Sequence, residues 1–481
     1  MNCRIRNRGR NSRVHPGKVK TAAQAVLALS IAFTLTACGP SAEQMRLNRA
    51  MYAARHEIYP DYRVCLEILE KYRTDERHEN EFVQYGMCET SLATLGGRYD
   101  LADSVGKHSH LAVEKYQNAN SETAAAISDE SLKFFKGEPH ERSLLGFYIG
   151  LACYIQGEYN DARIFFTQSV LASQTRDDDM EAFRGDFRLG HYWLGRAFLK
   201  LGQEDNARIA LSKAGQQMFH GGEQKEIERL RSNREKARKD ELKGEEICYE
   251  KGSGGKNPVA GIVDFSTGLN RSDMPEVLPG ASDDDPTELS ADALDAFLQR
   301  DLQEQVNLII VLELGWGPVK YLHGPSNAYD DYMQMEYKER GADVYVDGHR
   351  SAATFCLLDT YHQAVTRGVQ TRRGRQTTKA VTKAILKQLP YISWVASAWS
   401  VKADHRYWTS LPGEIHMFAA RVSPGLHDIA LRFYDINGAY LPRFNLVRHY
   451  IYVPEEGELV LVLRSVENQD NAYLLSHVSS K

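Results

Sequence analysis

The sequence predicts an α+β fold, in which an all-α array of helical repeats precedes a β-rich mixed domain. Two observations lead to this prediction. A glycine-spaced pattern that begins at Gly150 occurs again from Gly195, and both copies have the apolar spacing of helices. Farther along the chain, residues 307–314 form a continuous apolar run, and apolar residues recur at alternate positions from Ile429, as expected of strands.

Composition indicates a folded chain of several domains. Its 481 residues correspond to about three ordinary domains or two large ones, and a chain with 42% hydrophobic and 26% charged residues is globular. Lys and Arg number 59 against 64 Asp and Glu, so no basic excess is available to neutralise phosphates and we expect no nucleic-acid partner. We predict four segments: a signal peptide (1–37), a helical repeat domain (38–250), a linker or long loop (251–290) and an α+β domain (291–481).

The first forty residues have the pattern of an export signal. Residues 1–20 carry seven basic residues and no acid, and the apolar run 22–37 is shorter than the ~20 residues that span a bilayer. The run ends in Leu35-Thr36-Ala37-Cys38, which resembles the lipobox of bacterial lipoproteins. That resemblance implies that Cys38 is acylated and becomes the first mature residue. An ordinary signal peptide with a cysteine at its cleavage site is the alternative.

The same resemblance implies a location. Gly39 follows Cys38, whereas in such lipoproteins an Asp at this position favours retention at the inner membrane, so the resemblance favours the outer membrane of a bacterial envelope. Removal of residues 1–37 leaves 52 basic and 64 acidic residues, a net charge of −12. Beyond Cys38 the chain has five scattered cysteines without metal-ligand spacing, so we expect no disulfide framework.

The two copies of the glycine pattern agree at several positions. Their matched pairs are Gly150 and Gly195, Gly157 and Gly202, Ala162 and Ala207, Arg163 and Arg208, and Phe166 and Leu211. These positions resemble the tetratricopeptide repeat, which implies paired helices and a surface that holds a peptide or another domain. A third copy lies around Gly97, with Thr90 in place of the first-helix glycine. A generic helical bundle with glycine at its turns is the alternative.

Three further motifs resemble an uncharacterised family of bacterial lipoproteins that join such helices to a carboxy-terminal domain. They are the K-G-E-x-x-E-R run with Glu138, Glu141 and Arg142, the G-x-G-P-x-K run that ends at Lys320, and the D-x-R-x-W run with Asp404, Arg406 and Trp408. The family has no known activity to transfer. We predict structural roles, helix capping for the first motif and a buried charge pair at a helix–sheet junction for the third. Ligand binding is the alternative for both.

A basic stretch in the second half is a candidate contact for a membrane or a partner. Lys379, Lys383 and Lys387 fall on one face of a predicted helix, which suits an anionic membrane surface or an acidic partner. A solvated basic face is the alternative. Upstream, residues 344–349 have the pattern of a strand that enters a tight turn, and residues 357–367 that of a helix.

No catalytic motif accompanies these features. The chain lacks H-E-x-x-H, G-x-S-x-G and G-x-G-x-x-G, so we assign no catalytic, cofactor-binding or metal-ligating residues. We expect a lipid-anchored scaffold that binds other envelope proteins through its repeats. The alternative is an envelope hydrolase or glycan-acting protein whose carboxy-terminal domain is the active part. Glycan binding would use exposed tryptophans among Trp316, Trp394, Trp399 and Trp408.

Overall fold

The computed structural model describes residues 42–56, 62–119, 134–173, 187–216, 232–233, 236–237, 239, 306–323, 329–333, 335–351, 356–360 and 404–465. The predicted signal peptide with Cys38, the linker 251–290 and the lysines at 379, 383 and 387 lie outside these residues. The chain forms two compact units, Met1–Arg49 and Ala50–Lys481, and the boundary between them falls within α2. The second unit contains the repeat helices and the sheets together.

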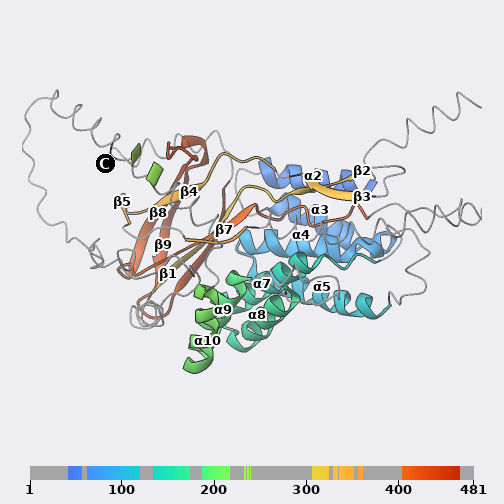
Figure 1. The fold of residues 1–481 in the computed structure, drawn as a ribbon, viewed down its shortest axis with the longest axis horizontal. Coiled ribbons are helices and arrows are strands. Elements are labelled where there is room, and N and C mark those ends of the chain that lie inside the picture. The colour runs from blue at the N-terminus through green and yellow to red at the C-terminus, as the bar shows by residue number, and fades with distance from the viewer. Residues whose placement is uncertain are drawn as a thin grey trace, which may run out of the picture. The chain divides into compact units, whose positions relative to one another are not determined.

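Helices come first along the described chain and strands second, which confirms the predicted α+β fold. The helices are α2 (Ala42–His56), α3 (Arg63–Arg73), the 3₁₀ helix η1 (Glu76–Glu81), α4 (Phe82–Leu95), α5 (Tyr99–Ala119), α7 (Pro139–Ile155), α8 (Tyr159–Ser173), α9 (Arg188–Lys200) and α10 (Glu204–Gln216). Figure 1 follows this order from blue to green. Successive helices pack in pairs, α4 with α5, α7 with α8 and α9 with α10, so the array consists of hairpins.

The same turn joins the two helices of every hairpin. Gly97, Gly157 and Gly202 have φ angles of 71°, 80° and 67°, the left-handed conformation that glycine adopts without steric cost. Each donates its N–H to the carbonyl three residues earlier, and the following residue donates to the carbonyl five residues earlier. This double hydrogen bond is the Schellman motif that ends a helix. The three predicted copies therefore share one turn geometry.

Side chains of complementary size let each hairpin close. A Cβ on Gly150 would lie 2.7 Å from the ring of Phe166, and a Cβ on Gly195 would lie 2.6 Å from Leu211. In the first hairpin the sizes are exchanged, because Thr90 stands at the first-helix position and Gly106 stands opposite it on the second helix. The replacement of the first-helix glycine by threonine is thus compensated across the hairpin.

The strands form two four-stranded sheets and a separate hairpin. They are β1 (Leu308–Leu314), β2 (Val319–His323), β3 (Tyr329–Met333), β4 (Gly341–Val346), β5 (His349–Arg350), β6 (Cys356–Thr360), β7 (Glu414–Ala420), β8 (Gly425–Tyr434), β9 (Leu446–Val453) and β10 (Leu459–Arg464). The sheet orders are β10-β1-β7-β6 and β5-β4-β8-β9, and β2 pairs with β3. The apolar run at 307–314 forms β1, a fully buried central strand, as predicted.

Alternate residues of β1 belong to one core that includes both sheets. Leu308, Ile310 and Leu312 pack in a cluster with Val344 of β4 and Leu431 of β8. This alternation follows from the two-residue period of a strand, which leaves the intervening residues of β1 on the other face of its sheet. The β4–β5 turn at 347–348 has two positive φ angles, as the sequence predicted. The predicted helix at 357–367 is wrong over 357–360, which belong to β6 and pair with β7.

Candidate functional site

Two of the motifs noted in the sequence meet at the start of α7. Glu141 is fully buried, and its carboxylate accepts hydrogen bonds from the backbone N–H of Glu138 and from that of Trp408, each at 2.6 Å. With Glu138 as N-cap, the first interaction belongs to a capping box, and Pro139 occupies the first helical position. Arg142 lies half-buried in the same turn. The second interaction ties this helix start to the segment that leads into β7.

The third motif supplies a charge pair at the same place, in which Arg406 is buried as predicted and Asp404 is half-buried. Arg406 donates from Nε to Asp404 Oδ1 and from Nη2 to Asp404 Oδ2, both at 2.8 Å, and its Nη1 donates to the carbonyl of Asn80. Lys320 of the G-x-G-P-x-K run pairs with Asp330 at 3.0 Å and lies 3.8 Å from Glu138 Oε1. All three motifs therefore converge on one junction between helices and strands.

The electrostatics of this junction suit a structural role. Burial, followed by the negative charge of Glu138, raises the pKa of Glu141 to about 7. Burial opposes ionisation of Asp404 as well, but the hydrogen bonds and charge of Arg406 outweigh it and lower the pKa of Asp404. The donors and acceptors of this cluster are directed at one another rather than at an open space, so the cluster holds the chain together.

The first helix of each hairpin contacts the β region of the same chain. On α4, Gln84 donates to the carbonyl of Tyr407 at 2.8 Å, and Ser91 shares a 2.7 Å hydrogen bond with Ser410. On α7 and α9, three long polar side chains reach the β strands and the loop before β10. They are Tyr148, which donates to Glu313, and Tyr154 and Arg196, which both donate to Glu458.

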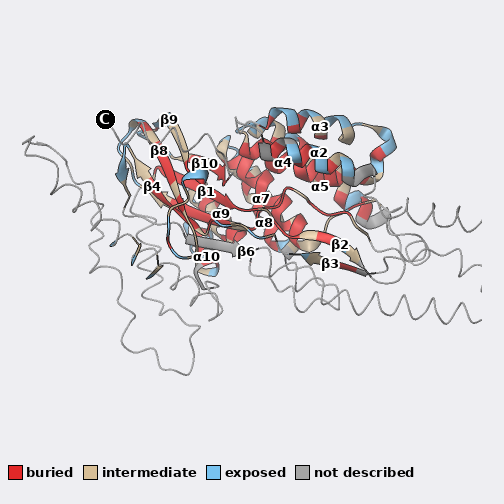
Figure 2. Cartoon of the chain, turned by 90° about the horizontal axis from the view of Figure 1, so that it is seen from above, coloured by how far each residue is buried: buried red, intermediate tan, exposed pale blue. Residues whose placement is uncertain are grey.

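Burial agrees with these contacts. In Figure 2, α4 and α7 are drawn almost entirely as buried, and only the ends of the two helices reach solvent. The inner face of the array, defined here as the face formed by α4, α7 and α9, is therefore occupied by the strands of the same chain. Repeat arrays generally use such a face to bind ligands. In this chain, its own strands cover that face.

The second helices of the hairpins present aliphatic side chains to solvent. Their large exposed apolar residues are Leu111 on α5, Ile164 and Leu171 on α8, and Ile209 on α10. Ile164 and Ile209 occupy equivalent positions when Gly150 is aligned with Gly195. Two hairpins therefore present an isoleucine outward at the same repeat position, with exposed fractions of 44% and 57%.

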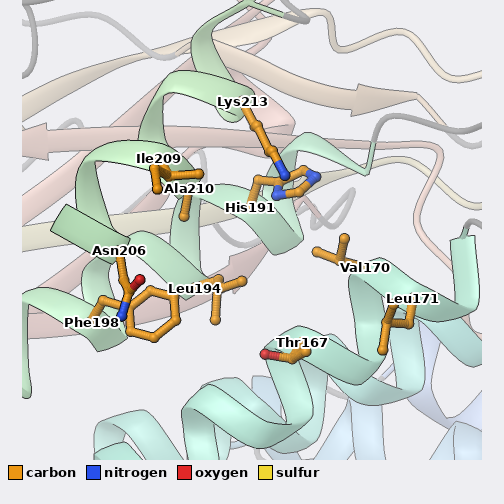
Figure 3. Close-up of a pocket in the computed structure, with 10 residues that line it drawn as sticks. All are labelled: Thr167, Val170, Leu171, His191, Leu194, Phe198, Asn206, Ile209, Ala210 and Lys213. Atoms are coloured by element: carbon orange, nitrogen blue, oxygen red, sulfur yellow. The ribbon is translucent and has the colours of Figure 1, made fainter. Parts of the chain in front are cut away.

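A groove opens between α8, α9 and α10, and we name it the outer groove (Figure 3). It has a volume of about 240 Å³. Its lining residues are Thr167, Val170, Leu171, His191, Leu194, Phe198, Asn206, Ile209, Ala210 and Lys213. The lining is mainly aliphatic, and the two groups with basic nitrogen, His191 and Lys213, lie together at one end, as Figure 3 shows.

The polar end of the outer groove has an unusual histidine. His191 is 5% exposed, and its Nδ1 has no hydrogen-bond partner among the described residues. Burial, followed by the charge of Lys213, lowers the pKa of His191 to about 4, so the imidazole is neutral at physiological pH. A buried ring nitrogen without a partner is costly, and a bound water or an acceptor on a ligand removes that cost.

One cluster resembles a hydrolase triad but has the wrong hydrogen bonds. His427 Nδ1 lies 2.7 Å from Asp347 Oδ2, and Ser423 Oγ lies 3.5 Å from His427 Nε2. However, Nε2 is 2.7 Å from the carbonyl oxygen of Ser423, which only accepts. Both ring nitrogens therefore face acceptors other than the serine hydroxyl, and neither is placed to take a proton from it.

A second cluster has the composition of a metal site. Ligand atoms of Asp103, Cys153 and Glu158 lie within 4.8 Å of one another. The ammonium of Lys107 already occupies this position, at 2.9 Å from Asp103 and 3.9 Å from Glu158. Burial raises the pKa of the Cys153 thiol, which favours the protonated form rather than the thiolate that binds metals. We assign no metal to this cluster.

The tryptophans proposed for glycan binding do not form an exposed surface in the described part of the chain. Trp408 is buried at the junction, where its indole donates to Ser410 at 2.7 Å. The guanidinium carbon of Arg464 lies 4.7 Å from the ring centroid of Trp316, so this ring is covered by a cation of the same chain. Trp394 and Trp399 lie outside the described residues.

Comparison of the chain with known protein families, with curated proteins and with solved structures found no match. None of the helices in the described ranges is both long and apolar enough to cross a bilayer.

Proposed function

We propose that this protein is a lipid-anchored, non-catalytic scaffold of the bacterial envelope, which binds other envelope proteins on the outer surface of its helical repeats. One observation carries the proposal. The inner face of the array is filled by strands of the same chain, whereas the outer groove is open, with Leu171 and Ile209 exposed and a buried His191 whose Nδ1 has no partner among the described residues. A groove with aliphatic walls and one polar end accepts side chains of a partner segment.

The anchor is the part of the proposal that derives from the sequence. The basic leader, the short apolar run and the lipobox-like residues that end at Cys38 support acylation at that thiol. Several acyl chains, at ~0.8 kcal/mol for each buried methylene, hold a protein stably at a bilayer. Mass spectrometry of the mature amino terminus tests this step. A mature chain that begins elsewhere, or an unmodified Cys38, contradicts it.

Affinity capture with matched variants tests the scaffold function. The tethered protein is purified from detergent-solubilised envelope, and the proteins that it captures are compared with those of the double variant Leu171→Asp/Ile209→Asp. Because two carboxylates in the outer groove oppose apolar docking, we expect a defined subset of envelope proteins to disappear. The control is Ile164→Asp, which places one carboxylate outside the groove at the repeat position equivalent to that of Ile209. Identical captured sets for all three proteins contradict the proposal.

A further inference from the structure

We propose that the outer groove receives a segment of a partner protein that inserts apolar side chains along α8–α10 and places a carboxylate between His191 and Lys213. This inference rests on the proposed scaffold function and names the chemistry of its partner. It concerns a surface that the sequence analysis did not identify.

The size of the groove favours side chains over a small molecule. Its volume of about 240 Å³ lies below the ~300–1,000 Å³ of sites that enclose a cofactor or a drug-sized ligand. Val170, Leu194, Phe198 and Ala210 supply apolar walls on three helices. A groove between helices that is open along one side accepts the apolar face of a helix or an extended segment, whose backbone remains in solvent.

The polar end selects the charge of the occupant. No carboxylate among the described residues forms an ion pair with Lys213, although ion pairs are frequent elsewhere in the array. The imidazole of His191 is buried beside this ammonium, and its Nδ1 has no hydrogen-bond partner in the described structure. A carboxylate is an acceptor for both nitrogen groups at once, and hydrogen bonds that involve a charged partner are the strong ones.

The polar end of the outer groove disfavours the opposite charge. A basic segment would bring a second cation to Lys213 and would leave the nitrogen of His191 without an acceptor. A purely apolar segment would bury the ammonium without a partner, which is unfavourable. The acidic–apolar combination is the one that satisfies every group that lines the groove, including the exposed aliphatic residues Leu171 and Ile209.

Two dyes test the charge preference in the full-length mature protein. The probes are 1-anilinonaphthalene-8-sulfonate and its neutral analogue N-phenyl-1-naphthylamine, which lacks the sulfonate. In fluorescence titrations we expect Lys213→Met to reduce the affinity for the anionic dye about 10-fold and to change the affinity for the neutral dye little. The loss of one charge-assisted contact corresponds to roughly that ratio of affinities. The matched control is Arg208→Met, a cation lost from an exposed position of α10 outside the groove lining.

A peptide pair tests the identity of the occupant. One probe is a helical peptide with leucines at i, i+3, i+4 and i+7 and a glutamate on the same face, and the other has glutamine in place of the glutamate. Tighter binding of the glutamate peptide to the wild type, lost in Lys213→Met and in Ile209→Asp, supports the inference. Equal binding of both peptides, or binding of decanoate without either peptide, overturns it.

The two proposals fail separately. If Leu171→Asp/Ile209→Asp abolishes capture of envelope proteins but Lys213→Met leaves both capture and the dye affinities unchanged, the scaffold function stands and the carboxylate inference is wrong. If the dyes and peptides bind as expected but the captured proteins do not depend on the groove, the chemistry of the site stands and its role in the scaffold is wrong. Circular dichroism of each variant confirms that the fold is retained before either comparison.

Discussion

One buried carboxylate, that of Glu141, joins the start of α7 to the segment that leads into β7. Glu141 accepts hydrogen bonds from its own helix cap and from Trp408, which is distant in the sequence. The capping role was predictable, because a Glu three residues after an N-cap completes a capping box. The contact with Trp408 was not, because no local rule relates two segments separated by hundreds of residues. Sequence therefore identified this residue and its local function but not its partner across the junction.

The titration of Glu141 predicts a pH effect on stability. Its pKa is raised from 4.5 to about 7 in the folded protein, so its contribution to stability is complete below pH 4.5 and is lost as the pH rises through 7. The loss is at most about 3 kcal/mol. We expect the unfolding free energy of the wild type to fall from pH 5 to pH 7.5 relative to that of Glu141→Gln, as measured by urea denaturation. Parallel curves for the two proteins contradict this, and exposed Glu204→Gln is the control.

The ion pair between Glu313 and Arg464 predicts strong coupling between two strands. Both side chains are fully buried, and Arg464 Nε donates to Glu313 Oε2 at 2.7 Å. Removal of one partner leaves a buried charge without compensation. We therefore expect Arg464→Met to lower the free energy of unfolding by about 3–5 kcal/mol. Glu313→Leu combined with Arg464→Met removes both charges and is expected to cost less than the sum. Additive losses in denaturant unfolding would show that the pair contributes no coupling.

The hairpins show which features of an element its sequence determines. The three turn glycines were predictable because a positive φ angle at a helix end favours glycine. The exchange of Thr90 and Gly106 was not, because the loss of one repeat glycine is compensated on the facing helix and is visible only in three dimensions. The outer groove was missed for a related reason. Repeated isoleucines at 164 and 209 were a signal, but helical spacing alone does not distinguish an apolar residue in the core from one at the surface.

The contact between α7 and α8 predicts which glycine matters most. A Cβ on Gly146 would lie 3.0 Å from the backbone of Phe165 and Ser169, whereas a Cβ on Gly157 would meet nothing within 4 Å. We expect Gly146→Leu to lower the free energy of unfolding by about 3 kcal/mol, because the larger side chain forces the two helices apart. Gly157→Ala is expected to cost about 1 kcal/mol, because only the left-handed backbone is disfavoured. Urea denaturation of both variants checks the order, and a larger loss for Gly157→Ala contradicts it.

At the scale of the whole second unit, the repeats and the strands share one buried junction. Glu313 on β1 receives hydrogen bonds from Tyr148 on α7 and from Arg464 on β10, and Arg464 also donates to the carbonyl of Ser410 at 2.7 Å. Because these hydrogen bonds share Glu313 and Arg464, opening of the junction breaks contacts of the helix, the strands and the connecting loop together. We therefore expect the repeat array, whose hairpins contact mainly their neighbours, to unfold as part of a larger cooperative structure.

This junction predicts that α7 and β1 open together. Hydrogen exchange is measured on peptides from the middle of α7 and from β1, and we expect the same opening free energy for both in the wild type. Arg464→Met weakens the junction, so its α7 and β1 peptides are expected to exchange at different rates. The control is Arg350→Met, which removes the 2.8 Å ion pair with Asp343 within the β5-β4-β8-β9 sheet and leaves the junction intact. Independent opening of α7 and β1 in the wild type would mean that the strands are not part of the structural unit formed by the repeats.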